Sequence, residues 1–182
     1  MRIIKTKFKG LFIIKRSTNF DNRGFLRELF EQKNFSKKFV FDYFSVSKKN
    51  VIRGLHLQLK KPQTKIISVI SGKIFDVVVD CRKASKTFGK HFSIYLSEND
   101  NTSLYISEGF AHGFCSLAND TILYYKNSNY RSKKHETGIL WNDKNLKIKW
   151  PIKKPILSSK DKKNLNFSEF LNRNNIKKKV EQ

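Results

Sequence analysis

The sequence has few cysteines and no long apolar run, and each shortage excludes a class of protein. Its 182 residues contain two cysteines, Cys81 and Cys115, both within apolar runs. We therefore expect buried, reduced thiols and no disulfide scaffold. No stretch is apolar enough to span a membrane. The basic N-terminal segment also lacks the apolar run and cleavage site of a signal peptide, so we expect a cytoplasmic protein without membrane insertion.

Acidic residues are also scarce. They number 15 against 38 lysines and arginines, which gives a formal net charge of +23. Such a charge attracts nucleic acids and other polyanions. The lysines are scattered, however, and no recognition helix, RNA-binding pattern or zinc finger accompanies them. We expect no specific nucleic-acid partner, with a basic nucleic-acid-binding β module as an alternative. A small substrate that carries phosphate would profit from the same positive field.

Several motifs of catalysis and phosphate binding are missing too. No serine sits on a nucleophile elbow, which argues against a Ser-His-Asp hydrolase. No glycine-rich loop of the Walker or dinucleotide-binding type occurs.

Short apolar stretches separated by turn residues recur along the chain and predict β-strands. The clearest lies at 66–81, where Ser71-Gly72 predicts a hairpin turn. Helix signals appear only near the end, where Ser168 is a candidate cap for 169–172. Many short strands indicate an all-β sandwich or barrel, and a jelly roll or cupin would enclose a pocket. We expect one domain over residues 1–182 with a few short helices and a frayed tail from about residue 174.

Residues 51–69 bring chemistry-bearing side chains close together. One predicted strand carries Arg53 and His56, and the next opens with Lys65. Strict alternation along a strand would put Arg53 and His56 on opposite faces. If they act together, the strand must contain a bulge or twist at Gly54. A second histidine, His112, stands between Gly109 and Gly113 further along the chain.

Two histidines raise the alternative of a metal site. His56, His112 and an acid could bind a metal ion, which would make the protein a metal-dependent cupin enzyme. The stretch 55–58 holds a single histidine, however, with Gln58 where a second might stand. We therefore expect neither a metal nor a cofactor.

Eight motifs in order resemble the dTDP-4-dehydrorhamnose 3,5-epimerases, a family of cupin-fold enzymes that act on sugar nucleotides. They run from about Phe8 to Asp161. The motifs are FDNRGFLREL, NVIRGLHLQ, QTKIISVISGKIFDVVVDCR, TFGKH, YISEGFAHGF, LYYKNSNY, GILWND and PILSSKD. The resemblance implies a cupin-like jelly roll, a homodimer and an isomerase that needs no cofactor.

The resemblance also implies roles for individual residues. His56 would be the general base, Tyr125 the opposing acid and Lys65 the cation that stabilises an enolate. Asp161 would orient the His56 imidazole, with Asp76 as a rival for that role. The implied substrate-binding residues are Arg23, Glu28, Phe41, Asp42, Tyr43, Arg53, Lys65, His112, Arg131, Glu136 and Lys160.

These residue types suit the implied reaction. A 4-keto group acidifies the protons at C3 and C5 of a hexose, and imidazole, with an ordinary pKa near 6.5, can remove them. An ammonium group stabilises the enolate, and a tyrosine can return a proton from the opposite face. The expected reaction converts dTDP-4-dehydro-6-deoxy-D-glucose to dTDP-4-dehydro-L-rhamnose, for surface-polysaccharide synthesis. The alternative is an epimerase that inverts one carbon only, on a different nucleotide sugar.

The chain departs from the family at the end that would bind the nucleobase. Phe41 and Tyr43 stand where the family usually has glutamine and asparagine, and Arg131 stands where it has a stacking tyrosine. Tyr130 is adjacent to Arg131. We therefore expect a weakened or altered base preference, with a guanidinium or another aromatic ring packed on the base.

Overall fold

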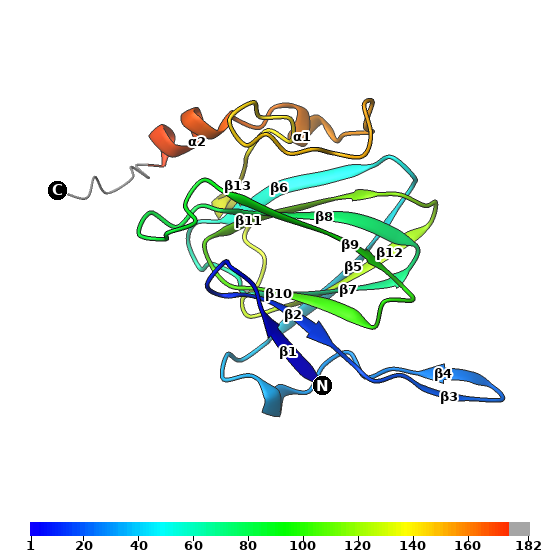
Figure 1. Cartoon of the computed structure of the whole chain (residues 1–182). Helices are drawn as coiled ribbons and strands as arrows, with labels where there is room; N and C mark the ends of the chain where they lie inside the picture. Colours follow the sequence, from blue (N-terminus) through cyan, green and yellow to red (C-terminus); the bar gives the residue numbers. More distant parts are fainter. Residues whose placement is uncertain (175–182) are drawn as a thin grey trace.

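The computed structural model describes residues 1–174, which form two antiparallel sheets packed face to face (Figure 1). The first sheet has the order β1 (Arg2–Lys5), β2 (Leu11–Lys15), β10 (Thr102–Ile106), β7 (Lys65–Ser71), β12 (Thr121–Asn127) and β5 (Phe41–Ser47). The second has the order β13 (Glu136–Gly138), β6 (Ile52–Gln58), β11 (Phe110–Ser116), β8 (Lys73–Asp80) and β9 (His91–Ser97). This arrangement confirms the all-β, cupin-like jelly roll.

The remaining elements are short. A separate hairpin of β3 (Asn19–Asp21) and β4 (Gly24–Leu26) projects from the body of the molecule (Figure 1). The helices are η1 (Gln32–Asn34), η2 (Lys133–His135), α1 (Ser159–Lys162) and α2 (Phe167–Arg173). No helix in the described part of the chain is long and apolar enough to cross a membrane.

Neighbouring strands in the sequence mostly lie in opposite sheets, which corrects the expected hairpin at 66–81. β7 pairs with β10 and β12, whereas β8 pairs with β11 and β9. Gly72 does supply a positive φ, +84°, but the turn carries the chain from one sheet to the other. Turn residues show where a chain reverses and do not determine which strands then pair.

Two apolar layers hold the fold together. One lies between the sheets and includes Ile67, Val78 and Leu104. The other lies on the outer face of the second sheet, where Val77 and Phe170 belong to the same cluster as residues of the C-terminal segment. Both cysteines are free and buried, as expected, and both belong to this outer layer. Strand β8 is therefore apolar on both faces because each face is covered.

A bulge in β6 brings Arg53 and His56 to the same side, as the sequence required. In the pairing with β11, His112 faces His56 and Phe114 faces Arg53, so β6 uses one more residue than its partner. Gly54, with φ +132°, occupies the bulge. A Cβ there would lie 2.5 Å from the Gly113 Cα, so the two backbones could not approach this closely with a larger residue.

The C-terminal helices are fixed by their caps. The Ser158 side chain accepts a hydrogen bond from the Asp161 N–H and begins α1. Asn166, and not Ser168, caps α2, because Glu169 three residues later completes a reciprocal capping box. The tail expected to fray falls mainly on residues 175–182, which lie outside the described residues.

Candidate active site

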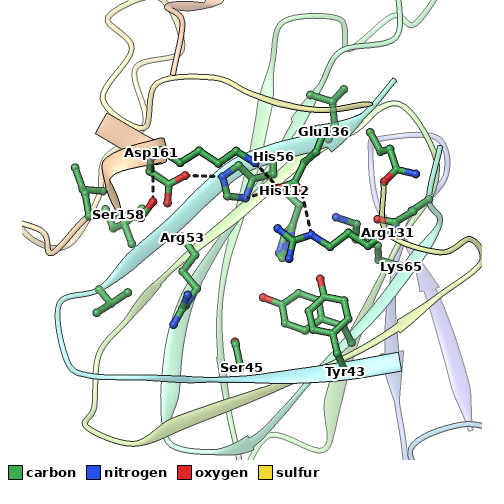
Figure 2. Close-up of a pocket in the computed structure, with 18 of the residues that line it drawn as sticks. Tyr43, Ser45, Arg53, His56, Lys65, His112, Arg131, Glu136, Ser158 and Asp161 are labelled. Carbon is green, nitrogen blue, oxygen red and sulfur yellow. Dashed lines mark hydrogen bonds and ion pairs between the residues drawn. The ribbon is translucent and has the colours of Figure 1, made fainter. Parts of the chain in front are cut away.

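A cavity of about 580 Å³ opens between the two sheets. Its second-sheet wall carries Arg53 and His56 from β6, His112 from β11 and Glu136 from β13. The opposite wall, formed by the first sheet, carries Tyr43 from β5, Lys65 from β7 and Tyr125 from β12. Arg131, Lys160 and Asp161 complete the lining from loops and α1. The predicted catalytic residues, which lie far apart in the sequence, thus meet in one cavity (Figure 2).

His56 is held by Asp161. The distance between His56 Nε2 and Asp161 Oδ1 is 2.5 Å, and Asp161 is buried (Figure 2). Burial by itself would raise the pKa of Asp161, but the hydrogen bond from His56 and further contacts lower it below its usual value. A carboxylate here accepts the Nε2 proton and leaves Nδ1 free to take a proton from a substrate.

Asp76, the rival partner for His56, belongs to the other histidine. Its Oδ2 lies 2.7 Å from His112 Nε2, and both residues are buried. The cavity wall therefore carries two His–Asp pairs side by side, since His56 and His112 face each other in the β6–β11 pairing. Of the two candidate carboxylates, Asp161 is the one that contacts His56.

Glu136 is surrounded by positive charge. Arg131 Nε lies 2.9 Å from its Oε2, Lys160 Nζ lies 2.8 Å from its Oε1, and His56 Nδ1 is 3.8 Å from Oε1. Burial would raise the pKa of Glu136, but the hydrogen bonds from Arg131 and Lys160 outweigh it and lower the pKa to about 2. Glu136 is thus ionised at neutral pH and orients two cations at the cavity.

On the opposite wall, burial has the largest effect on the pKa values of the ionisable side chains. It raises the pKa of Tyr125 well above 10, so this hydroxyl keeps its proton at neutral pH. Burial also lowers the pKa of Lys65 to about 8, which leaves its ammonium charged below that pH. Tyr43 stacks on Tyr125, with ring centroids 4.6 Å apart and planes 16° apart. This wall offers a neutral proton donor beside a poorly solvated cation.

Arg53 is oriented without a carboxylate. Its Nε donates to Ser47 Oγ at 3.0 Å and its Nη2 donates to the Val46 carbonyl at 3.0 Å. Among residues 1–174 it forms no ion pair. Its guanidinium therefore retains charge and donors for an anion in the cavity.

Four predicted substrate-binding residues do not line this cavity. Asp42 lies on the outer face of the first sheet, where it accepts a 2.7 Å hydrogen bond from the Tyr124 hydroxyl, because alternation turns it away from Tyr43. Arg23 and Glu28 are exposed at and after the projecting hairpin, and Arg23 pairs with Asp21 at 2.6 Å. Phe41 contacts the Tyr43 ring from one side at 5.5 Å between centroids.

Among the cavity residues that the sequence analysis missed are Ser45 and Ser158. Ser45 lines the cavity, and the alternation Phe41, Tyr43, Ser45 along the predicted strand was a signal that could have found it. Ser158 also lines the cavity and caps the helix that carries Asp161. A serine three residues before an acid is a helix-start signature, so that cap was readable too.

The described residues do not offer a metal site. Residues 1–174 contain no group of three or more His, Cys, Asp or Glu side chains placed to hold a metal ion. One ring nitrogen of each cavity histidine already faces an aspartate, at 2.5 Å for His56 and 2.7 Å for His112. The donor set is thus arranged as two His–Asp pairs.

Comparisons with known proteins identify the family of this chain. The family model for dTDP-4-dehydrorhamnose 3,5-epimerase matches residues 5–169. The chain belongs to this family. A relative from Shigella flexneri, named dTDP-4-dehydrorhamnose 3,5-epimerase, is 45% identical over 88% of this chain and 93% of its own.

Solved structures give the same result for this epimerase-family chain. The Bacillus anthracis dTDP-4-dehydrorhamnose 3,5-epimerase, crystallised with TDP and PPi, is 41% identical with a TM-score of 0.88 over 91% of this chain and 99% of that one. A Legionella pneumophila enzyme in complex with dTDP-4-keto-L-rhamnose is 35% identical with a TM-score of 0.91 over 100% of this chain and 99% of that one. The chain is an isomerase of the epimerase class by family.

Proposed function

We propose that this protein converts dTDP-4-dehydro-6-deoxy-D-glucose to dTDP-4-dehydro-L-rhamnose by proton transfer, without a cofactor, for surface-polysaccharide synthesis. One observation carries the proposal: His56, paired with Asp161, and Tyr125 stand on opposite walls of one cavity. Inversion of a carbon requires a base on one face of the sugar and an acid on the other.

The steps follow from the groups on each wall. His56 Nδ1 removes the proton from C3 or C5, and the electron pair moves onto the 4-keto oxygen as an enolate. The Lys65 ammonium stabilises that oxygen. Tyr125 then donates its proton to the same carbon from the opposite face, and the enolate collapses back to the ketone. Proton exchange with solvent restores His56 and Tyr125.

The nucleotide part would lie against the cations. Arg53 and Lys160 suit a diphosphate, with His112 in the same cavity and Arg131 held by Glu136.

The base would meet the rings of Tyr43, Phe41 and Tyr130. Phe41 lies between the other two, with centroids 5.5 Å from Tyr43 and 5.9 Å from Tyr130. Rings of this kind stack on any base, so we expect a weak base preference. One titration comparing dTDP, UDP, GDP and CDP tests it, and a strong dTDP preference would contradict it.

The decisive experiment is NMR of the substrate with the protein in D₂O. We expect deuterium at both C3 and C5 and formation of the L-rhamno product. Deuterium at C3 alone after complete turnover would identify an enzyme that inverts one carbon, which is the alternative function. No incorporation at either carbon would reject the proposal.

The metal-dependent alternative is tested by chelation. If Lys65 stabilises the enolate, activity should survive exhaustive chelation unchanged, because no divalent ion takes part. The measurement is the rate before and after chelation, with metal analysis of the same sample. Loss of activity that one specific metal restores would favour the rival.

We also propose a homodimer in the cytoplasm. The β3–β4 hairpin carries exposed Phe20, Phe25 and Leu26, and such apolar surface is a common docking element. A second protomer's cavity would give Arg23 and Glu28 their expected substrate contacts. Light scattering of the intact protein and of the double variant Phe20→Ser/Phe25→Ser tests the dimer, and an unchanged mass in the variant would contradict it.

The cytoplasmic location is supported by the two free, buried cysteines, which suit a reducing compartment.

A further inference from the structure

Tyr43 and Tyr125 form an unusually close pair. They face each other directly in the β5–β12 pairing, and their rings stack with centroids 4.6 Å apart. This is the shortest separation among the aromatic pairs in residues 1–174. The ring of Tyr43 therefore covers one face of the Tyr125 ring inside the cavity.

A second ring approaches Tyr125 in the cavity, at an edge and not at the stacked face. His112 approaches the Tyr125 ring in an edge arrangement, with centroids 6.2 Å apart and planes at 71°. His112 is itself held by Asp76, so it forms a fixed second contact. Without the Tyr43 ring, Tyr125 would border an open cavity on one side and could change its ring orientation.

The hydroxyl of Tyr43 is not needed for this role. Burial raises the pKa of Tyr43 to about 12, so the group is neutral at physiological pH and brings no charge to the reaction. A phenylalanine would keep the stacked face. An asparagine or leucine at position 43 would remove it.

We propose that Tyr43 is a positioning residue whose ring fixes the direction of the Tyr125 hydroxyl and so sets how often an enolate is protonated on the inverting face. The inference rests on the proposed function of Tyr125 as the acid. It separates two processes. Removal of the C–H proton by His56 needs no help from Tyr43, whereas return of a proton from the opposite wall does.

The test uses Tyr43→Asn and Tyr43→Phe in the full chain, with Val46→Asn as a matched control. Val46 lies on the same strand, its side chain is exposed on the outer face, and the backbone carbonyl that accepts from Arg53 is kept in the variant. The substrate is dTDP-4-dehydro-6-deoxy-D-glucose in D₂O. Deuterium incorporation and inverted product are followed separately at C3 and C5, together with kcat and KM.

For Tyr43→Asn we expect the ratio of inversion to exchange to fall between about tenfold and 10²-fold, the cost of a misplaced catalytic group. KM should rise as well, because the Tyr43 ring also borders the proposed base site, whereas the ratio of inversion to exchange does not depend on binding. Tyr43→Phe and Val46→Asn should resemble the wild type in this ratio. A normal ratio in Tyr43→Phe would show that the ring of Tyr43, and not its hydroxyl, positions Tyr125.

Three outcomes would overturn the inference. Exchange and inversion that fall in parallel would show a general structural effect, and an increase in KM alone would make Tyr43 only a binding residue. An unchanged ratio would show that Tyr125 holds its direction unaided. Tyr43→Leu, which preserves an apolar wall, gives the same readout if circular dichroism shows that Tyr43→Asn is unfolded. If Tyr125→Phe still forms inverted product at the wild-type rate, Tyr125 is not the acid. That result would contradict the proposed function itself, whereas the three outcomes above contradict only the role of Tyr43.

Discussion

The two walls of the cavity obtain their chemistry in different ways. On the second-sheet wall, each histidine has a carboxylate partner, and Glu136 has two cations within hydrogen-bond distance. Against the effect of burial, hydrogen bonds and nearby charges there lower the pKa of Asp161 and bring that of Glu136 to about 2. On the first-sheet wall, burial is the largest influence on Tyr43, Lys65 and Tyr125.

The difference suits the two halves of a proton-transfer reaction. A base must be correctly oriented, which a carboxylate hydrogen-bonded to its far nitrogen achieves. An acid must keep its proton until an enolate forms, which burial of a phenol achieves. A cation that is poorly solvated also interacts more strongly with a developing negative charge. The comparison predicts that variants on the two walls fail in different ways.

Removing the base should have the largest effect. His56→Ala should abolish deuterium incorporation at C3 and C5, because loss of a general base typically costs about 10²–10⁴-fold. Incorporation is measured by NMR in D₂O. His91→Ala, on β9 and outside the cavity lining, is the control and should behave as the wild type. Activity within about threefold of wild type in His56→Ala would remove His56 from the mechanism.

Removing the acid should separate exchange from inversion. Tyr125→Phe should still exchange protons through His56 but lose inverted product by about 10²-fold or more, since only the opposite wall has lost its donor. The ring and its stacking on Tyr43 remain. Product analysis at each carbon measures the effect. Equal losses of proton exchange and of inverted product in Tyr125→Phe would contradict separate roles for the two walls.

The two aspartates should differ, although each contacts a histidine. Asp161→Asn should lower kcat on the order of 10²-fold, because the imidazole of His56 loses its orientation. Asp76→Asn is the matched comparison, and should leave proton removal by His56 nearer to wild type because its partner is His112. Steady-state kinetics with deuterium exchange measures both. Equal losses of exchange would show that the histidines act as one unit.

The pH profile should give the smallest effect. With the pKa of Lys65 at about 8, kcat/KM should fall above that pH as the ammonium loses its proton. In Lys65→Arg, the fall in kcat/KM should shift to higher pH, because a guanidinium stays charged. If kcat/KM falls at the same pH in Lys65→Arg as in the wild type, a group other than Lys65 causes the fall.

The same shift has a consequence for stability. The folded pKa of about 8 lies below the unfolded value of 10.5, so the unfolded chain binds more protons between them. Lys65 therefore makes the fold more stable as pH rises through that window. Comparing the pH dependence of the unfolding midpoint in wild type and Lys65→Met measures this contribution, and identical curves would contradict it.

Much of the local structure was readable from the residues. Short apolar stretches predicted strands such as β8, and the burial of Cys81 and Cys115 followed from their apolar neighbours. The bulge at Gly54 followed from requiring Arg53 and His56 on one side. The cap of α2 was assigned to the wrong residue, because Asn166 and Glu169 make a reciprocal pair that a single-residue signal overlooks.

By itself, then, the sequence determined the strand-rich jelly roll, the absence of a disulfide framework and the presence of His56, Lys65 and Tyr125, since side-chain alternation and motif order are properties of the chain. Only the tertiary structure decided that the turn at Gly72 joins two sheets and that Asp42 faces outward. It also decided between the two carboxylates for His56. Asp161 lies 105 residues from its histidine, and Asp76 lies 36 residues from His112. The position of α1 beside β6 sets the first contact and the pairing of β8 with β11 sets the second, and no local pattern in the sequence records either.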